Sequence, residues 1–312
     1  PVNLKRLFEI NQKPVGTPGW VRKRDLRHLA TEAIGKKEYD WIFTVVQSHG
    51  STYYHAMVEV VPRVLWGMRL LRAVPQIRVV SSSPIAAMLL DLLGIANPAL
   101  NSNGKPIFAR TVTIPPPGTP ENKRTQRLQT HMLRSLRTEI ASHSSAWNHH
   151  TVGLTNGGGG GDLGAAPTIL VVRRAAAVKR RTRAMLNHDE VMATLGRVLS
   201  IPKEKDLALT EWPPEASLPQ AVAVWGRTRL AIAPHGAGGT NILFMPSGST
   251  FVEIIAGDQK GRVYGSLATS MGHRYVPCIY NRSDTRFQPQ LPRALKNTDN
   301  FIVNVPWLLR CV

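Results

Sequence analysis

The fold is decided by residues 230–244, which read LAIAPHGAGGTNILF. The apolar run from Leu230 to Ala233 predicts a buried strand, and Thr240 to Phe244 predict a helix that stops before a proline. The glycine-rich turn between them has few side chains to keep a ligand away from the backbone. N–H groups at a helix start favour an anion such as phosphate. The turn therefore predicts either an anion site or a tight connection in which the glycines only permit the geometry.

The turn and the strand that follows it supply a first set of candidate ligand contacts. The candidates in the turn are His235, Gly236, Ala237, Gly238 and Asn241. The turn is neither a P-loop, because the Lys-Ser/Thr pair is missing, nor a G-x-G-x-x-G fingerprint. Glu253 comes late in the next predicted strand, Thr250 to Ile255, where a carboxylate can accept hydrogen bonds from ribose hydroxyls. A lone carboxylate there is more often an exposed strand terminus.

A second apolar strand, Thr168 to Val172, runs directly into a cluster of cations. This cluster comprises Arg173, Arg174, Lys179, Arg180, Arg181 and Arg183. Guanidinium groups make forked contacts with phosphate oxygens, so such a cluster can neutralise a diphosphate without a metal ion. The alternative is a solvated basic loop. Their place at the carboxyl end of a strand favours Arg173 and Arg174, and we expect the later cations to be more exposed.

The third signal is a row of polar residues on a predicted helix, Tyr54 to Val74, which Pro62 should kink or divide. His55 and Glu59 are four residues apart and therefore share one helical face, which Arg63 continues. A histidine with an orienting carboxylate can act as a general base near neutral pH. The alternative is a salt-bridge ladder on the surface.

Strand–helix alternation extends over the whole chain and predicts an α/β fold. It is lost over residues 142–167, which include five consecutive glycines, and this stretch predicts a linker or loop. The halves, 1–141 and 168–312, should hold a ligand in the cleft between them, near the carboxyl ends of their strands. His149 and His150 lie in the linker without a nearby carboxylate or cysteine, so we expect no metal site there.

Composition narrows the possible partners. The chain has 312 residues, 43% of them hydrophobic, and a net charge of +19, which indicates either an anionic partner or a generally basic surface. No apolar run reaches the roughly 18 residues of a membrane-spanning helix. Cys278 and Cys311 are too few for a thiolate zinc cluster, although one disulfide is possible. Asn281 begins a glycosylation sequon, which is weak support for a secretory location.

Taken together and in this order, these segments resemble glycosyltransferase family 61. Residues 53–65 are similar to that family's aromatic-His segment and Pro-Arg-Leu helix, and residues 235–254 to its most recognisable stretch. Ile169 to Arg174, with Arg180, Arg181 and Asn187, is similar to its strand, paired arginines and following Asn. Two features depart from the family pattern. Gly239 replaces a usual Leu, which should loosen the packing behind the turn, and Ala175 to Val178 lengthen the gap between the arginine pairs.

The resemblance implies a GT-B architecture, in which two Rossmann-like domains face each other. Residues 1–141 would form the acceptor side and residues 168–312 would bind the nucleotide sugar. It further implies a UDP-sugar donor, an inverting reaction, no required metal or other cofactor, and a glycan, glycoprotein or wall-polysaccharide acceptor. The expected location is the Golgi or endoplasmic-reticulum lumen, with a membrane anchor before Pro1.

The catalytic base has more than one candidate. His55 and Glu59 are our choices for the base, and His235 is a competitor whose place suits phosphate or sugar contact better. Two other functions stay open. One is a non-catalytic protein that binds nucleic acid or another polyanion, which the charge favours but the absence of aromatics interleaved with the cations does not. The other is an inactive family member that binds glycans.

Overall fold

The computed structural model describes residues 38–46, 50, 52–101, 107–115, 123–143, 168–174, 183–199, 208–213, 216–256, 263–280 and 300–312. The chain divides into two compact units, Pro1–Met132 and Leu133–Val312, and the division falls inside helix α6 (Lys123–His143). The first two residues of the predicted linker, 142–167, belong to α6, and residues 144–167 lie outside the described part of the chain, so the predicted domain boundary stays a prediction. None of the described helices combines the length and apolar character needed to cross a bilayer.

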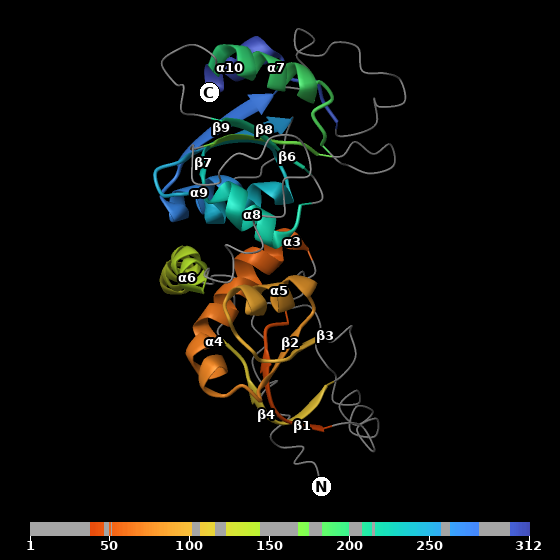
Figure 1. The fold of residues 1–312 in the computed structure, drawn as a ribbon, viewed down its shortest axis with the longest axis vertical. Coiled ribbons are helices and arrows are strands. Elements are labelled where there is room, and N and C mark those ends of the chain that lie inside the picture. Colours follow the sequence, from red (N-terminus) through yellow and green to blue (C-terminus); the bar gives the residue numbers. More distant parts are fainter. Residues whose placement is uncertain are drawn as a thin grey trace. The chain divides into compact units, whose positions relative to one another are not determined.

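The first unit contains a four-stranded parallel sheet in the order β3-β2-β1-β4 (Figure 1). The short strand β3 was not predicted. Ser83 caps α5 (Pro84–Leu92), because the Ile85 N–H donates to Ser83 Oγ at 3.2 Å. The strands are β1 (Glu38–Thr44), β2 (Arg78–Ser81), β3 (Ala99–Asn101) and β4 (Phe108–Thr113), and the helices before α6 are α3 (Tyr53–His55), η1 (Ala56–Val60), α4 (Val61–Ala73) and α5 (Pro84–Leu92).

Pro62 divides the predicted helix over residues 54–74, as expected. The turn before it, η1, is a π-helix, and α4 carries Pro62 in its first turn. Proline has no N–H to donate to the carbonyl four residues earlier, that of Val58. Gln129 Nε2 donates to this carbonyl instead, at 2.7 Å. Single π-helical turns are rare and occur frequently at functional sites, so the shape of this segment is itself informative.

The second unit contains a five-stranded parallel sheet in the order β6-β5-β7-β8-β9. Helices α7 and α10 lie on one face, and α8, α9 and the 3₁₀ helix η4 on the other (Figure 1). The chain order reverses between β5 and β7, where α/β sheets bind ligands. The strands are β5 (Thr168–Val172), β6 (Ala208–Trp212), β7 (Thr228–Pro234), β8 (Thr250–Ala256) and β9 (Arg274–Tyr280), and the helices are α7 (His188–Leu199), α8 (Leu218–Trp225), η4 (Ala237–Phe244), α9 (Val263–Met271) and α10 (Val305–Cys311).

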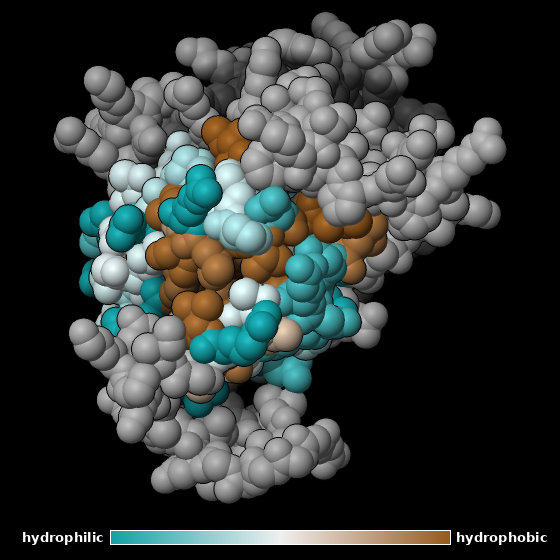
Figure 2. Space-filling view, turned by 90° about the horizontal axis from the view of Figure 1, so that it is seen from above, coloured by the Kyte–Doolittle hydropathy of each residue, from teal (hydrophilic) through white to brown (hydrophobic). Residues whose placement is uncertain are grey.

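The C-terminal segment, residues 300–312, is fastened to the second unit. Cys278 on β9 and Cys311 on α10 form a disulfide, and Phe301 N donates to Ala184 O at 3.0 Å. Asn187 directly precedes α7, and its side-chain amide binds the carbonyl and the N–H of Val303, each at 2.8 Å, and donates to Glu190 Oε2 at 2.9 Å. The asparagine thus holds the C-terminal segment. On the side of α7 and α10, apolar side chains form a patch flanked by hydrophilic ones (Figure 2).

Candidate functional site at the carboxyl ends of β5 and β7

The point at which the strand order reverses brings an arginine onto the glycine turn. Arg174 lies just beyond β5, and its Nη1 donates to the carbonyl oxygen of His235, just beyond β7, at 2.9 Å. A Cβ atom built on Gly236 would lie 1.4 Å from this nitrogen. Gly236 also has φ 156° and ψ 176°, a conformation that essentially only glycine adopts. The backbone and the guanidinium group therefore both require glycine at this position.

The positively charged side chain of Arg174 is half-buried. Burial lowers the pKa of Arg174, the positive charge of Arg183 lowers it further, and Tyr264 acts in the opposite direction. No described carboxylate forms an ion pair with Arg174. Arg183, one of the cations after Arg174, is half-buried as well, and whether it is the more exposed of the two stays a prediction. Two neighbouring cations at the end of a parallel strand favour an anionic ligand.

Backbone N–H groups add to this positive region. The helix predicted from Thr240 begins earlier, at Ala237, and it is a 3₁₀ helix whose N-terminus no side chain caps. The first N–H groups of a helix, here those of Ala237 and Gly238, have no partner within it. Asn241, a predicted ligand contact, is buried. The backbone N–H groups of the turn therefore lie close to the Arg174 guanidinium, which binds the carbonyl of His235.

The space behind the turn is filled by aromatic rings. A Cβ atom on Gly239 would lie 3.2 Å from Phe251 and 3.3 Å from Tyr264. The resemblance places Leu at this position, and we expected glycine to loosen the packing. That expectation is wrong, since the two rings already occupy the place of a larger side chain.

His235 is held by a buried carboxylate. Its Nδ1 lies 2.5 Å from Glu253 Oε1, and the Tyr275 hydroxyl donates to Glu253 Oε2 at 2.5 Å. Glu253 is completely buried, so it is not the exposed strand terminus that the sequence allowed. Burial and the Glu253 carboxylate raise the pKa of Tyr275, which keeps the phenol protonated. The ring of Tyr264 packs edge-on against His235, with the ring centres 5.4 Å apart.

Arg173 has a different environment from Arg174. Its Nε and one Nη lie 2.7 and 3.0 Å from the two carboxylate oxygens of Glu211, and the same Nη also contacts Asp189. The hydrogen bond from Arg173 is the main reason why the pKa of Glu211 is lowered. Glu211 also binds the buried His188 at 2.9 Å. The Nε and one Nη of Arg173 thus bind carboxylates of the protein itself. Two other predicted ligand contacts, Arg180 and Arg181, lie outside the described residues.

The first unit carries the predicted His–Glu pair. His55 Nδ1 lies 2.7 Å from Glu59 Oε1, and Glu59 is buried in the π-helical turn. Burial and Glu59 raise the pKa of Tyr54 to about 12. Arg63 donates to Val46 O, just beyond β1, at 3.0 Å. This row of His55, Glu59 and Arg63 is not an exposed salt-bridge ladder, because Glu59 is buried and Arg63 binds the backbone just beyond β1.

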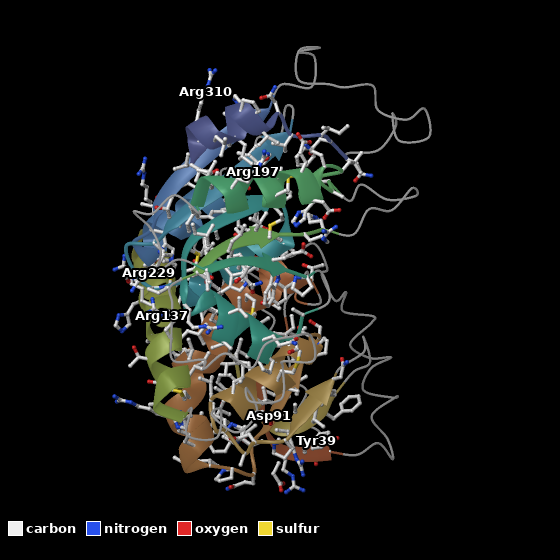
Figure 3. All side chains as sticks on the ribbon, turned by 45° about the horizontal axis from the view of Figure 1, so that its top comes forward. Tyr39, Asp91, Arg137, Arg197, Arg229 and Arg310 are labelled. Atoms are coloured by element: carbon white, nitrogen blue, oxygen red, sulfur yellow. A yellow bond between two sulfur atoms is a disulfide. The ribbon has the colours of Figure 1, made fainter. Side chains whose placement is uncertain are left out.

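A second basic area of the second unit lies apart from the turn. Arg229 is near the amino end of β7, opposite His235, and its charge lowers the pKa of Arg137, after burial as the first cause. Figure 3 shows both side chains on the same side of the unit. Arg137 and Arg134 donate to backbone carbonyls of Met245 and Ser270 at 2.5 and 2.7 Å. The described residues contain no group of three metal-ligating side chains, and independence from metal stays a prediction.

Comparison with known proteins agrees with the segments found above. The model of the family Glycosyltransferase 61 matches residues 53–252, which include the His55–Glu59 pair, Arg174 and the glycine turn. No curated protein matched the chain. Because the family match spans more than half of the chain, the protein belongs to glycosyltransferase family 61 and is a glycosyltransferase.

Proposed function

We propose that the protein transfers a sugar, with inversion, from a UDP-sugar to a hydroxyl group of a glycan, glycoprotein or wall polysaccharide, without a metal ion. The observation that carries the proposal is the half-buried Arg174 lying on Gly236, where the strand order reverses. Nucleotides bind at such points in α/β sheets. A fixed guanidinium and free backbone N–H groups suit a diphosphate.

The proposed reaction requires the protein to stabilise the leaving diphosphate and to accept a proton from the acceptor hydroxyl. The acceptor oxygen attacks the anomeric carbon, the bond from that carbon to the diphosphate oxygen breaks, and its electron pair stays on UDP. Arg174 and the turn N–H groups stabilise the charge that develops there. A general base takes the acceptor proton, and we assign this role to His55 with its partner Glu59. A GT-B arrangement of the two units is part of this proposal.

The disulfide supports a location in the secretory pathway. Disulfides persist in oxidising compartments and are rare in the cytosol. The pairing of Cys278 with Cys311 therefore favours the endoplasmic-reticulum or Golgi lumen, where proteins and polysaccharides are glycosylated.

Thermal unfolding in EDTA tests the donor site. UDP at 100 times its dissociation constant should stabilise the protein by about 2.7 kcal/mol. Arg174→Ala should remove most of this effect. The matched control is Arg197→Ala, because Arg197 is an exposed arginine of α7 in the same unit. Stabilisation that requires Mg²⁺ or Mn²⁺ would contradict the metal-free part, and equal losses in both variants would contradict the site.

Polyanion binding is the second candidate, favoured by the proximity of Arg137 and Arg229. In this case heparin should stabilise the protein more than UDP does. Arg229→Ala should weaken that effect, whereas Arg174→Ala should leave it unchanged. The same thermal assay thus separates the two functions.

A further inference from the structure

The carboxylate behind His235 has both oxygens in use. Glu253 accepts from the Tyr275 hydroxyl at one oxygen and lies 2.5 Å from His235 Nδ1 at the other. Both Glu253 and Tyr275 lie outside the span of the family match, which ends at residue 252. His235, by contrast, lies inside that span.

The chemistry of the pair decides which nitrogen carries a proton. An ionised carboxylate only accepts hydrogen bonds, so the contact between Glu253 and His235 needs a donor on the imidazole. The proton between Glu253 and His235 therefore belongs to Nδ1, which donates to the carboxylate. Nε2 then takes up and releases the second proton, and it has no hydrogen-bond partner in the described part of the chain. This is the logic by which a buried Asp selects the tautomer of the catalytic His in serine proteases.

We propose that Glu253 and Tyr275 are positioning residues that hold His235 so that its Nε2, when protonated, donates a hydrogen bond to the diphosphate of the donor. The proposal rests on the proposed function. Protonation takes one proton from solvent, and the imidazolium keeps it while the electron pair of the breaking bond goes to UDP. His235 thus supplies positive charge beside Arg174 only when it is protonated.

The surroundings of His235 are compatible with this role. Groups of both signs lie against His235: the Arg174 guanidinium donates to its carbonyl, the Glu253 carboxylate binds its Nδ1, and a ring edge of Tyr264 packs against the imidazole. A bound diphosphate adds negative charge and so favours the imidazolium. By linkage, donor affinity should be greatest when His235 is protonated. It should fall as the pH rises and the imidazolium loses its proton.

The test compares UDP binding by wild type and His235→Asn. The Asn amide nitrogen can keep the Nδ1 contact with Glu253, whereas nothing replaces Nε2. At about pH 6 the variant should bind UDP about tenfold to a hundredfold more weakly, the range for a hydrogen bond between charged groups. The difference should shrink by about pH 8. The terminal phosphate of UDP itself titrates at about pH 6, but this contribution is common to both proteins.

Proton uptake supplies a readout that a merely structural role would not change. Calorimetry in buffers of different ionisation enthalpy should show that wild type takes up protons on binding UDP and that His235→Asn takes up fewer. His143→Asn is the control, because His143 lies at the end of α6 and binds the carbonyl of Glu139. This control should behave as wild type.

Two further variants test the positioning residues. Glu253→Gln and Tyr275→Phe should both reduce the proton uptake, Tyr275→Phe by less because it leaves the carboxylate in place. If the buried Glu253→Gln change prevents folding, Tyr275→Phe and His235→Asn decide the question. UDP binding with equal affinity and proton uptake in wild type and His235→Asn would overturn the inference and leave the proposed function standing. Absence of UDP binding to wild type would overturn the proposed function itself.

Discussion

Replacing Gly236 by alanine should damage the donor site through a single neighbour. The new Cβ atom would lie 1.4 Å from Arg174 Nη1, so the guanidinium must leave the turn. It is the far end of a flexible side chain and can move away, which should let the protein fold. The backbone cost remains, because alanine at φ 156° is strained by about 1–3 kcal/mol.

The two effects of this substitution have separate magnitudes. The strain should lower the melting temperature by about 2–4 °C for each kcal/mol in a unit of this size. Displacing Arg174 should weaken UDP binding about tenfold to a hundredfold, the range for a hydrogen bond to a charged group. Gly248→Ala is the matched control, since Gly248 also has a positive φ, 82°, but open space around it. That variant should lose stability and keep its UDP affinity.

A double-mutant cycle with Arg174→Ala tests the reasoning. If Gly236→Ala acts on binding by displacing Arg174, the double variant should bind UDP no more weakly than Arg174→Ala alone, as measured by calorimetry. Losses in binding free energy that add fully would show that Gly236 contributes independently of Arg174. Unchanged UDP affinity in a folded Gly236→Ala protein would remove the turn from the donor site.

Three other outcomes are expected. His55→Ala should lower turnover about a hundredfold to ten-thousandfold, measured as the rate of UDP release, and leave UDP affinity unchanged. Glu59→Gln is the companion variant, and normal turnover in both variants would show that the pair is structural. Arg173→Ala should cost at most about 1 kcal/mol of stability in urea unfolding, because its ion pairs are partly exposed, and should not weaken UDP binding. A loss as large as that of Arg174→Ala would return Arg173 to the site. Replacing Cys278 and Cys311 by serine should lower the free energy of unfolding by about 3–4 kcal/mol, since the disulfide closes a separation of 33 residues; a double variant as stable as wild type in urea unfolding would contradict this value.

Local signals in the sequence predicted most of the elements. The apolar run of β5 was predicted with its observed bounds, Thr168–Val172, because a strand covered on both faces reads as a continuous apolar stretch. The capping box at the start of α8 is a signal of the same kind, because Ser217 and Gln220 form both of its hydrogen bonds with each other. Such signals need no knowledge of the rest of the fold.

Features that depend on distant contacts were not predictable in the same way. The α10 helix is seven residues long and is held by a disulfide and by the Asn187–Val303 contact. Glu253 stands alone in the sequence because its partners are distant along the chain: His235 lies just beyond β7, and Tyr275 is on β9. Their meeting is set by the sheet register, in which Glu253 pairs with Pro277 on β9. No local pattern contains that register.

The contrast between Arg173 and Arg174 follows from strand geometry. Successive side chains of an extended chain point to opposite sides, so two adjacent arginines at a strand end do not readily face the same ligand. Arg173 turns to Glu211 on β6, whereas Arg174 turns to the end of β7. Since β5 lies between these two strands, only one of the pair can face the point where the strand order reverses. A count of cations therefore overstates the charge available to a donor diphosphate, and the acidic residue on β6 is the feature that separates the ion-paired arginine from the ligand-binding one.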